Sequence, residues 1–232
     1  MKKQLTAQGK PFEFTPENLE KAAALIMRYP EGRQGSALVP LLDLAQRQTG
    51  GWLPQEAIEY VARYLGLSFM QGYEVASFYS MFNLSPVGKY FVQVCTTTPC
   101  QLRGAMDVLK ACDDFMGGGF GVPQGQPSNN DGLFSVCEVE CLGACVNGPV
   151  VQINDAYYED LDSVKMTEIL CMLKMGKTVD SGSQIGRQGS APEGGPQVLK
   201  FDSDSTPNPD SEFTESIANM DTDIDVDKGR TL

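Results

Sequence analysis

Four of the seven cysteines in this 232-residue chain fall into two closely spaced pairs. Four residues separate Cys95 from Cys100, and three separate Cys141 from Cys145. Thiolates bind zinc and the irons of iron–sulfur clusters, and this spacing lets one loop offer two of them to the same site. Two such loops can close around a single site with four thiolate ligands. The sequence therefore predicts one metal centre on Cys95, Cys100, Cys141 and Cys145.

The residues between the paired cysteines are small, which suits an iron–sulfur cluster. A 2Fe–2S cluster takes two thiolates on each iron and gains negative charge on reduction, so backbone N–H groups must approach its sulfurs. Residues 96–98 are all threonine, and Gly143 and Ala144 let the backbone come close. A structural zinc site with four thiolates uses the same spacing. On the residues alone, an electron-transfer protein and a zinc-stapled interaction protein both stay open.

The other three cysteines are interpreted as structural. Cys112 and Cys171 fall within expected helices and are expected to be small, buried apolar side chains. Cys137 precedes Cys141 by four residues and could compete for a ligand position, but it lies in an expected strand. The chain has no histidine, which excludes Ser–His and Cys–His catalysis and Rieske-type clusters. We expect no catalytic residue, flavin site or nicotinamide site on this chain alone.

Charge and hydropathy restrict the partners. The formal net charge is −12, which disfavours binding to nucleic acid or to anionic membranes. No apolar run reaches the about 20 residues of a membrane-spanning helix, so no direct membrane insertion is expected. Residues 180–232 carry 11 acidic and 4 basic residues and begin with a stretch rich in Gly, Ser and Pro. Such a segment buries too little apolar area to offset its ordering entropy, so we expect a disordered acidic C-terminal tail over residues 179–232.

Helical periodicity with short connections predicts a four-helix bundle over residues 15–84, preceded by a flexible arm over residues 1–14. Thr15 can cap the first of these helices, and Pro16 suits its first position. The helices are expected to begin near Pro16, Ser36, Pro54 and Ser68. Phe78, Tyr79 and Phe82 are interpreted as core residues of this bundle.

The pattern changes in residues 85–178, where the order is strand, helix, three strands and helix. Aromatic and β-branched residues predict the strands, and apolar residues at helical spacing predict the helices. The strands are expected at residues 90–94, 133–139, 150–153 and 157–159, and the helices at 102–115 and 163–175. A loop over residues 117–132 is expected to be flexible. This α+β order is compatible with a thioredoxin-like fold.

Three sequence blocks resemble a known family. EVASFYSMFNLSPVGKY, VQVCTTTPC and EVECLGACVNGPVVQIND, the last followed by YYEDL, are similar to the thioredoxin-like 2Fe–2S subunit of respiratory complex I. The resemblance covers residues 12–178. It implies an N-terminal helical bundle followed by a thioredoxin-like 2Fe–2S ferredoxin domain. It also favours iron over zinc, with Cys95, Cys100, Cys141 and Cys145 as the ligands of one 2Fe–2S cluster.

The resemblance further implies a place in a larger enzyme. In that family the chain is a subunit of NADH:quinone oxidoreductase, and its partner is the FMN-binding subunit, which binds FMN and NADH. Other subunits of the peripheral arm are further expected partners. The cluster exchanges single electrons with the FMN during NADH oxidation and quinone reduction. The equivalent subunit of an NAD-linked bidirectional hydrogenase or formate dehydrogenase is the alternative.

The same resemblance implies a location. We expect the chain to be cytoplasmic and peripheral, on the inner face of a bacterial plasma membrane. The matrix side of the mitochondrial inner membrane is the alternative.

Overall fold

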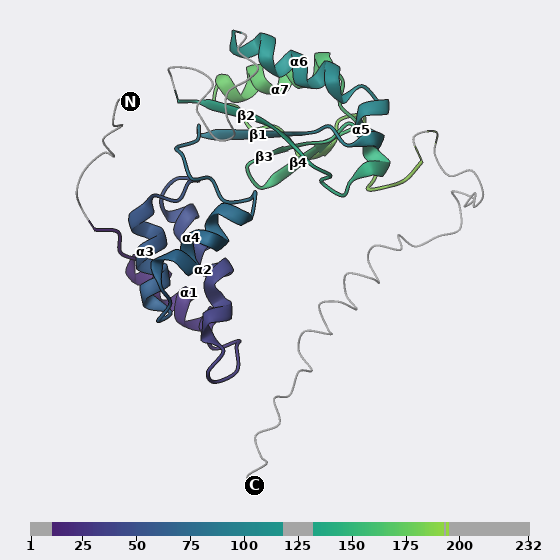
Figure 1. The fold of residues 1–232 in the computed structure, drawn as a ribbon. Helices are drawn as coiled ribbons and strands as arrows, with labels where there is room; N and C mark the ends of the chain where they lie inside the picture. Colours follow the sequence, from purple (N-terminus) through teal and green to yellow (C-terminus); the bar gives the residue numbers. More distant parts are fainter. Residues whose placement is uncertain (1–10, 118–131, 193, 195–232) are drawn as a thin grey trace. The chain divides into compact units, whose positions relative to one another are not determined.

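The computed structural model describes residues 11–117, 132–192 and 194 (Figure 1). The expected flexible loop over residues 117–132 therefore lies almost wholly outside the described residues. The same is true of residues 1–10 of the expected arm and of most of the expected tail beyond residue 192. None of the helices in the described ranges is long and apolar enough to cross a membrane.

Residues 11–84 form the helical part of the chain, with four α-helices and one short 3-10 helix. The α-helices are α1 (Pro16–Ile26), α2 (Leu38–Gln48), α3 (Gln55–Tyr64) and α4 (Phe69–Phe78), and the 3-10 helix, Gln34–Ala37, leads directly into α2. The side chain of Thr15 accepts a hydrogen bond from the Asn18 N–H at the start of α1. Ser68 and Gln71 form a reciprocal capping box at the start of α4. Capping residues therefore set two of the helix starts, as expected from the sequence.

The helices of this part share one apolar core, and the core corrects two expectations. Phe14, which we assigned to the flexible arm, is 4% exposed and packs edge-to-face against Tyr60. Phe82 is buried, as expected, but Phe78 is 79% exposed and Tyr79 is also exposed. The buried residues of α4 are Gly72 and Ala76, one turn apart. Phe78 follows Ala76 by two positions and so points to the opposite side of the helix.

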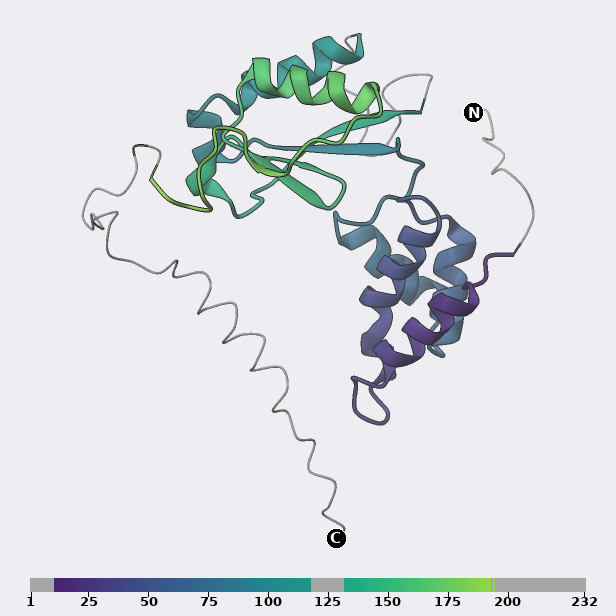
Figure 2. The ribbon, with the colours of Figure 1, turned by 180° about the vertical axis from the view of Figure 1, so that it is seen from behind.

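Residues 85–189 form the α/β part of the chain, which is built on one five-stranded sheet. The strands are β1 (Tyr90–Cys95), β2 (Phe134–Val139), β3 (Val151–Ile153), β4 (Ala156–Glu159) and β5 (Gly182–Ser183), in the order β2-β1-β3-β4-β5. The pairs β1–β2 and β4–β5 are parallel, and the two central pairs are antiparallel. The helices α6 (Ala105–Met116) and α7 (Ser163–Lys174) lie side by side on one face of the sheet (Figures 1 and 2).

The core of the α/β part lies between that sheet face and the two helices. Its buried residues come from β1–β4, α6, α7 and Leu161, and the largest fully buried side chain is that of Phe134. The expected helix over residues 102–115 is confirmed as α6, but it begins three residues later, and a short helix before it was not expected. The chain first forms the short helix α5 (Thr98–Leu102) and then α6, because Gly104 between them adopts a φ of 98° that ends one helix before the next begins.

The chain stays ordered beyond α7, which corrects the expected start of the tail. β5 pairs with β4 in the register Tyr158↔Gly182 and Glu159↔Ser183. Residues 179–189 therefore belong structurally to the α/β part, and the first compact unit of the chain extends to Gly189. Composition concealed this strand, because it is only two residues long and Gly and Ser have low strand propensity.

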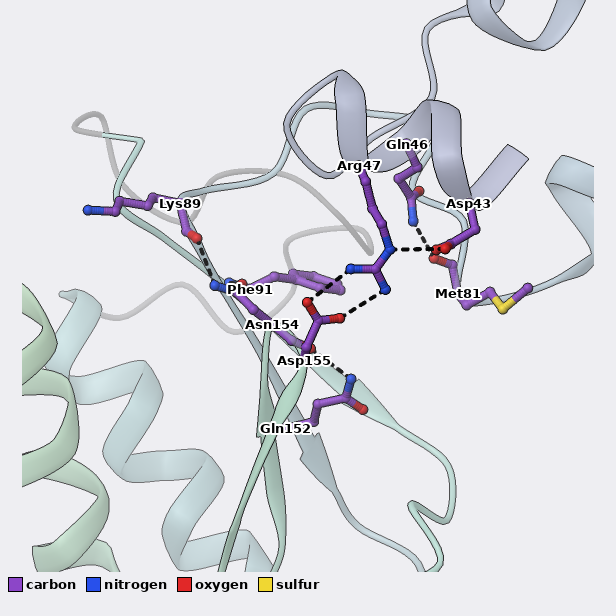
Figure 3. Close-up of polar contacts among 9 residues, drawn as sticks. All are labelled: Asp43, Gln46, Arg47, Met81, Lys89, Phe91, Gln152, Asn154 and Asp155. Carbon is purple, nitrogen blue, oxygen red and sulfur yellow. Dashed lines mark hydrogen bonds and ion pairs between the residues drawn. The ribbon is translucent and has the colours of Figure 1, made fainter. Parts of the chain in front are cut away.

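One ion pair links a helix of the helical part to the hairpin turn between β3 and β4 (Figure 3). Arg47 on α2 donates two hydrogen bonds of 3.0 Å to the Asp155 carboxylate, and its Nε donates to Asp43. The pKa of Asp155 is lowered, mainly by the hydrogen bonds from Arg47. Next to it, the side chain of Asn154 bridges the backbone of Lys89 and Phe91. These contacts fix the turn, although the exposed ion pair itself contributes little to stability.

Candidate metal centre

The first cysteine pair lies at the end of β1 and in the helix that follows. Cys95 is the last residue of β1 and is 2% exposed. Cys100 lies in α5, not in a loop as expected, and is 1% exposed. Thr97 precedes α5, and its Oγ1 is 3.7 Å from the Cys95 Sγ. The turn from strand into short helix thus places both thiols of this pair inside the protein.

The second pair lies after β2 and is exposed. The Sγ atoms of Cys141 and Cys145 are 3.6 Å apart, and both side chains reach the surface. The N–H of Gly143 donates to the Cys141 Sγ at 3.4 Å. Gly143 has a φ of 82°, which lets the backbone turn so that both thiols point the same way. The Tyr157 hydroxyl on β4 donates to the Leu142 carbonyl at 2.9 Å and so ties this loop to the sheet.

The two pairs interact with each other. The Leu142 N–H, from the second loop, donates to Cys95 of the first pair. Burial opposes ionisation of Cys95, but hydrogen bonds from Leu142 and Thr97 outweigh burial, and the pKa of Cys95 is lowered. The pKa of Cys145 is raised, first by its hydrogen bond with Cys141 and also by the negative charges of Cys141 and Cys95. The four thiol groups are therefore close enough to influence one another's ionisation.

Burial makes the Cys100 thiol hard to ionise. Burial, together with the hydrogen bond to Cys95, raises the pKa of Cys100 to about 11, and the Val150 N–H partly offsets this. Binding to a metal requires the thiolate, so a metal ion must supply the positive charge that stabilises Cys100 in that form.

The donor set fits a 2Fe–2S cluster. Such a cluster needs two thiolates on each iron, and the chain offers two thiol pairs. It also needs N–H donors to its sulfurs, and the backbone at Thr97, Leu142, Gly143 and Val150 supplies them. Within the described ranges, no three Cys, Asp or Glu side chains, the four paired thiols included, are already arranged to hold a metal ion. The sequence-based expectation that Cys95, Cys100, Cys141 and Cys145 would hold a cluster therefore requires the two pairs to close on it when it binds.

Close backbone packing surrounds the buried thiols. A Cβ placed on Gly148 would lie 3.2 Å from the Cys100 Sγ and 3.5 Å from the Cys145 carbonyl oxygen. Gly148 follows the 3-10 turn Cys145–Asn147 and precedes a cis peptide bond to Pro149. Cys95 and Cys100 pack together with Ala105 and Val150 in a small buried cluster. The two cysteine segments therefore pack directly on one another, with no side chain between Gly148 and Cys100.

The remaining cysteines lie elsewhere. Cys112 on α6 and Cys137 on β2 are buried, and burial raises the pKa of each thiol to about 12. Cys171 is exposed on α7, which corrects the expectation that it is buried. It lines an open groove between α6 and α7 together with Lys110 and Thr167. Burial of Cys112 and Cys137 suits structural roles.

Sequence reasoning missed three residues beside the second cysteine loop. Asn147 and Asp160 are buried polar residues, and Arg187 forms an ion pair with Asp160. Asn147 lies within the quoted block EVECLGACVNGPVVQIND, where nothing distinguished it from a turn residue. Arg187 gave no signal, because it stands in a stretch rich in Gly and Ser that was assigned to the tail.

Comparison with known proteins places these features in a family. Residues 22–174 match the family of the thioredoxin-like [2Fe-2S] ferredoxin. The chain is 55% identical over 159 residues to a subunit of the NADH-quinone oxidoreductase of Rickettsia typhi, covering 68% of this chain and 91% of that protein. It is 47% identical over 191 residues to NADH dehydrogenase [ubiquinone] flavoprotein 2, mitochondrial, of Dictyostelium discoideum, covering 82% of this chain and 75% of that protein.

Among solved structures, a thioredoxin-like [2Fe-2S] ferredoxin from Aquifex aeolicus matches 39% of this chain and 84% of its own, with a TM-score of 0.31 and 22% identity. The family match spans both cysteine pairs and most of the helical part. The chain therefore belongs to the thioredoxin-like [2Fe-2S] ferredoxin family.

Proposed function

We propose that this chain is an electron-transfer subunit of an NADH-quinone oxidoreductase, with one 2Fe–2S cluster held by Cys95, Cys100, Cys141 and Cys145. The observation that carries the proposal is the meeting of two thiol pairs from two separate segments. The hydrogen bond from Leu142 to Cys95 joins those segments. The relatives named as subunits of NADH-quinone oxidoreductase support the assignment to that enzyme.

The chain's own residues prepare the site for a negatively charged group. When bound, the cluster supplies reversible one-electron chemistry. N–H groups of Thr97, Leu142 and Gly143 point at thiol sulfurs and stabilise negative charge there. Burial of Cys95 and Cys100 excludes water from one side of the site, whereas Cys141 and Cys145 face outward. We infer that a redox partner approaches from the exposed side.

We further propose that the partner is a subunit that binds FMN and NADH. The sequence of this chain carries no nucleotide-binding fingerprint, so the hydride chemistry belongs to another chain. Other peripheral subunits of the same complex are further partners, and the complex holds this chain at the inner face of its membrane. No described helix spans a membrane, which is compatible with a peripheral position.

The proposed division of the chain follows from the two cores. Residues 15–84 act as a four-helix bundle, and residues 85–178 act as the thioredoxin-like 2Fe–2S domain, to which residues 179–189 add an edge strand. The remainder is proposed to be an acidic tail that the cluster site does not require, because the contacts described above for the cysteine segments come from residues up to Gly189.

The test measures NADH oxidation by this chain, by its flavin-binding partner, and by the two together, with ferricyanide as electron acceptor. We expect no NADH oxidation by this chain alone, co-purification of the pair, and activity in the pair. A redox titration of this chain should show uptake of one electron per cluster at low potential, because reduction adds negative charge to an acidic protein. NADH oxidation by the isolated chain, free of flavoprotein, would contradict the proposed division of labour. Co-purification with hydrogenase or formate dehydrogenase subunits would assign the chain to that complex instead.

A further inference from the structure

The segment that follows α7 returns along the edge of the sheet. We name residues 179–189 the C-terminal strap. Figure 2 shows it as the yellow-green segment beyond α7. The Val179 carbonyl accepts a hydrogen bond from the Tyr158 hydroxyl, β5 pairs with β4, and the Gln184 N–H donates to the Glu159 carbonyl at 3.0 Å. The strap lies beyond the family match, which ends at residue 174.

A buried ion pair anchors the strap. The side chains of Arg187 and Asp160 are 8% and 2% exposed, and the Arg187 guanidinium donates to the Asp160 carboxylate. The Ser183 hydroxyl donates to the other Asp160 oxygen at 2.6 Å and accepts from the Arg187 N–H at 3.2 Å. A buried carboxylate is costly without such partners. Asp160 therefore depends on the strap for its charge compensation.

The strap reaches the backbone beside a cluster ligand. Val146 and Asn147 follow Cys145 directly and form the 3-10 turn with it. Arg187 Nη1 donates to the Val146 carbonyl at 3.4 Å, and the Asn147 side chain donates to the Gly189 carbonyl at 2.7 Å.

The strand before the strap holds the same turn. The Asn147 carbonyl accepts from the Asp160 N–H at 2.7 Å, and the Asn147 amide also donates to Glu159 at 2.6 Å. The turn after Cys145 is thus fixed from β4 and from the strap together. One residue farther on, Gly148 packs against Cys100 of the other pair.

We propose that the C-terminal strap positions the Cys145 turn, with Arg187 as the positioning residue that joins it to Asp160 and to the Val146 carbonyl. The inference rests on the proposed cluster assignment. Hydrogen bonds and solvent access around the sulfurs govern how a cluster is retained and what its electronic environment is. The Cys145 side chain is exposed, so burial in a core does not hold it in place. Contacts from the strap would limit the movement of this proposed ligand instead.

Two variants of the full-length chain separate positioning from stability. Arg187→Lys keeps a positive charge next to Asp160, but it replaces the fork of two nitrogens, of which Nη1 reaches the Val146 carbonyl and Nη2 reaches Asp160, by one nitrogen. The double variant Asp160→Asn/Arg187→Gln removes both charges, so no carboxylate is left buried without a partner. Arg63→Gln, at an exposed position on α3, is the matched control.

The readouts are the rate of iron release to a chelator, the EPR spectrum of the reduced cluster and the thermal unfolding midpoint. We expect the double variant to release iron about 10-fold to about 100-fold faster than the wild type, as is typical when outer contacts of metal ligands are lost. Its g values should shift while its midpoint stays close to that of the wild type. Arg187→Lys should release iron at an intermediate rate, and Arg63→Gln at the wild-type rate.

Wild-type iron release and an unchanged EPR spectrum in the folded double variant would overturn the positioning role. If the double variant does not fold, the Arg187→Lys variant provides the test. Wild-type iron release and a wild-type EPR spectrum in that variant would also overturn the positioning role. A wild-type chain that binds zinc and no iron would instead refute the proposed function on which this inference rests.

Discussion

Substitution of Gly148 by alanine tests the packing of the two cysteine segments. The new Cβ would lie 3.2 Å from the Cys100 Sγ, 3.5 Å from the Cys100 Cα and 3.5 Å from the Cys145 carbonyl oxygen. Favourable contacts between heavy atoms lie at about 3.5–4.0 Å, so the Cys100 sulfur must move by several tenths of an ångström. Gly148 has φ −66° and ψ 151°, which any residue adopts, so the cost is steric and not conformational.

The expected magnitude follows from two opposing effects. Overpacking of a well-packed region costs about 1–3 kcal/mol. Replacing glycine by alanine also restricts the unfolded chain, which stabilises the folded state by about 0.4–1 kcal/mol. The net loss of unfolding free energy is about 1 kcal/mol. In a chain of this length, that loss lowers the unfolding midpoint by about 2–4 °C. Because the displaced atom is the sulfur of a proposed ligand, the iron content should fall together with the midpoint.

The assay compares Gly148→Ala with Gly35→Ala by thermal unfolding and by iron content. Gly35 is a suitable control because its φ is not positive, and a Cβ there would meet only the flexible Leu67 side chain, at 3.4 Å. We expect Gly35→Ala to leave both quantities unchanged or to raise the midpoint slightly. A wild-type iron content and midpoint in Gly148→Ala would refute the direct packing of the Cys145 turn against Cys100.

Two further predictions concern pH and the C-terminus. Burial raises the pKa of Cys112 from its ordinary 9.0 to about 12, so the stability that this thiol contributes is fully present below pH 9 and is lost as the pH rises toward 12. Cys112→Ala should therefore flatten the fall of the unfolding free energy above pH 9, by up to about 1.4 kcal/mol per pH unit. Removal of residues 193–232 should leave the visible spectrum and the unfolding midpoint unchanged. Removal of residues 180–232 should lower the midpoint, because the buried Asp160 carboxylate then lacks its ion-pair partner Arg187. Equal midpoints for the two truncated chains would show that the strap contributes nothing to stability.

The sequence predicted the parts of the fold in which local chemistry decides the structure. The helix expected to begin near Ser68 and the strand expected from the aromatic and β-branched run of β1 are both present. The start of the helix expected over residues 102–115 was misplaced, because periodicity does not reveal the positive φ that Gly104 adopts. Phe78 was assigned to the core on its hydrophobicity, but the face of α4 is set by its tertiary neighbours.

The surroundings of the cysteines were less predictable than the cysteines themselves. Pair spacing and the resemblance selected the four candidate ligands, which stay a prediction until the metal is measured. The contacts of Arg187 with Asp160 and Val146 join residues far apart in the chain, and no local pattern encodes them. The burial of Phe14 was missed for the same reason, since its partner Tyr60 lies on another helix.

The most direct test of the central assignment is the iron and acid-labile sulfide content of Cys145→Ser and Cys171→Ser, measured next to the wild-type chain. Both cysteines are exposed, so the two variants perturb the fold to a similar degree. We predict about two irons and two sulfides per chain in the wild type and in Cys171→Ser, and loss of most of both in Cys145→Ser. Wild-type iron and sulfide in Cys145→Ser, or zinc without sulfide in the wild-type chain, would contradict the 2Fe–2S site on Cys95, Cys100, Cys141 and Cys145.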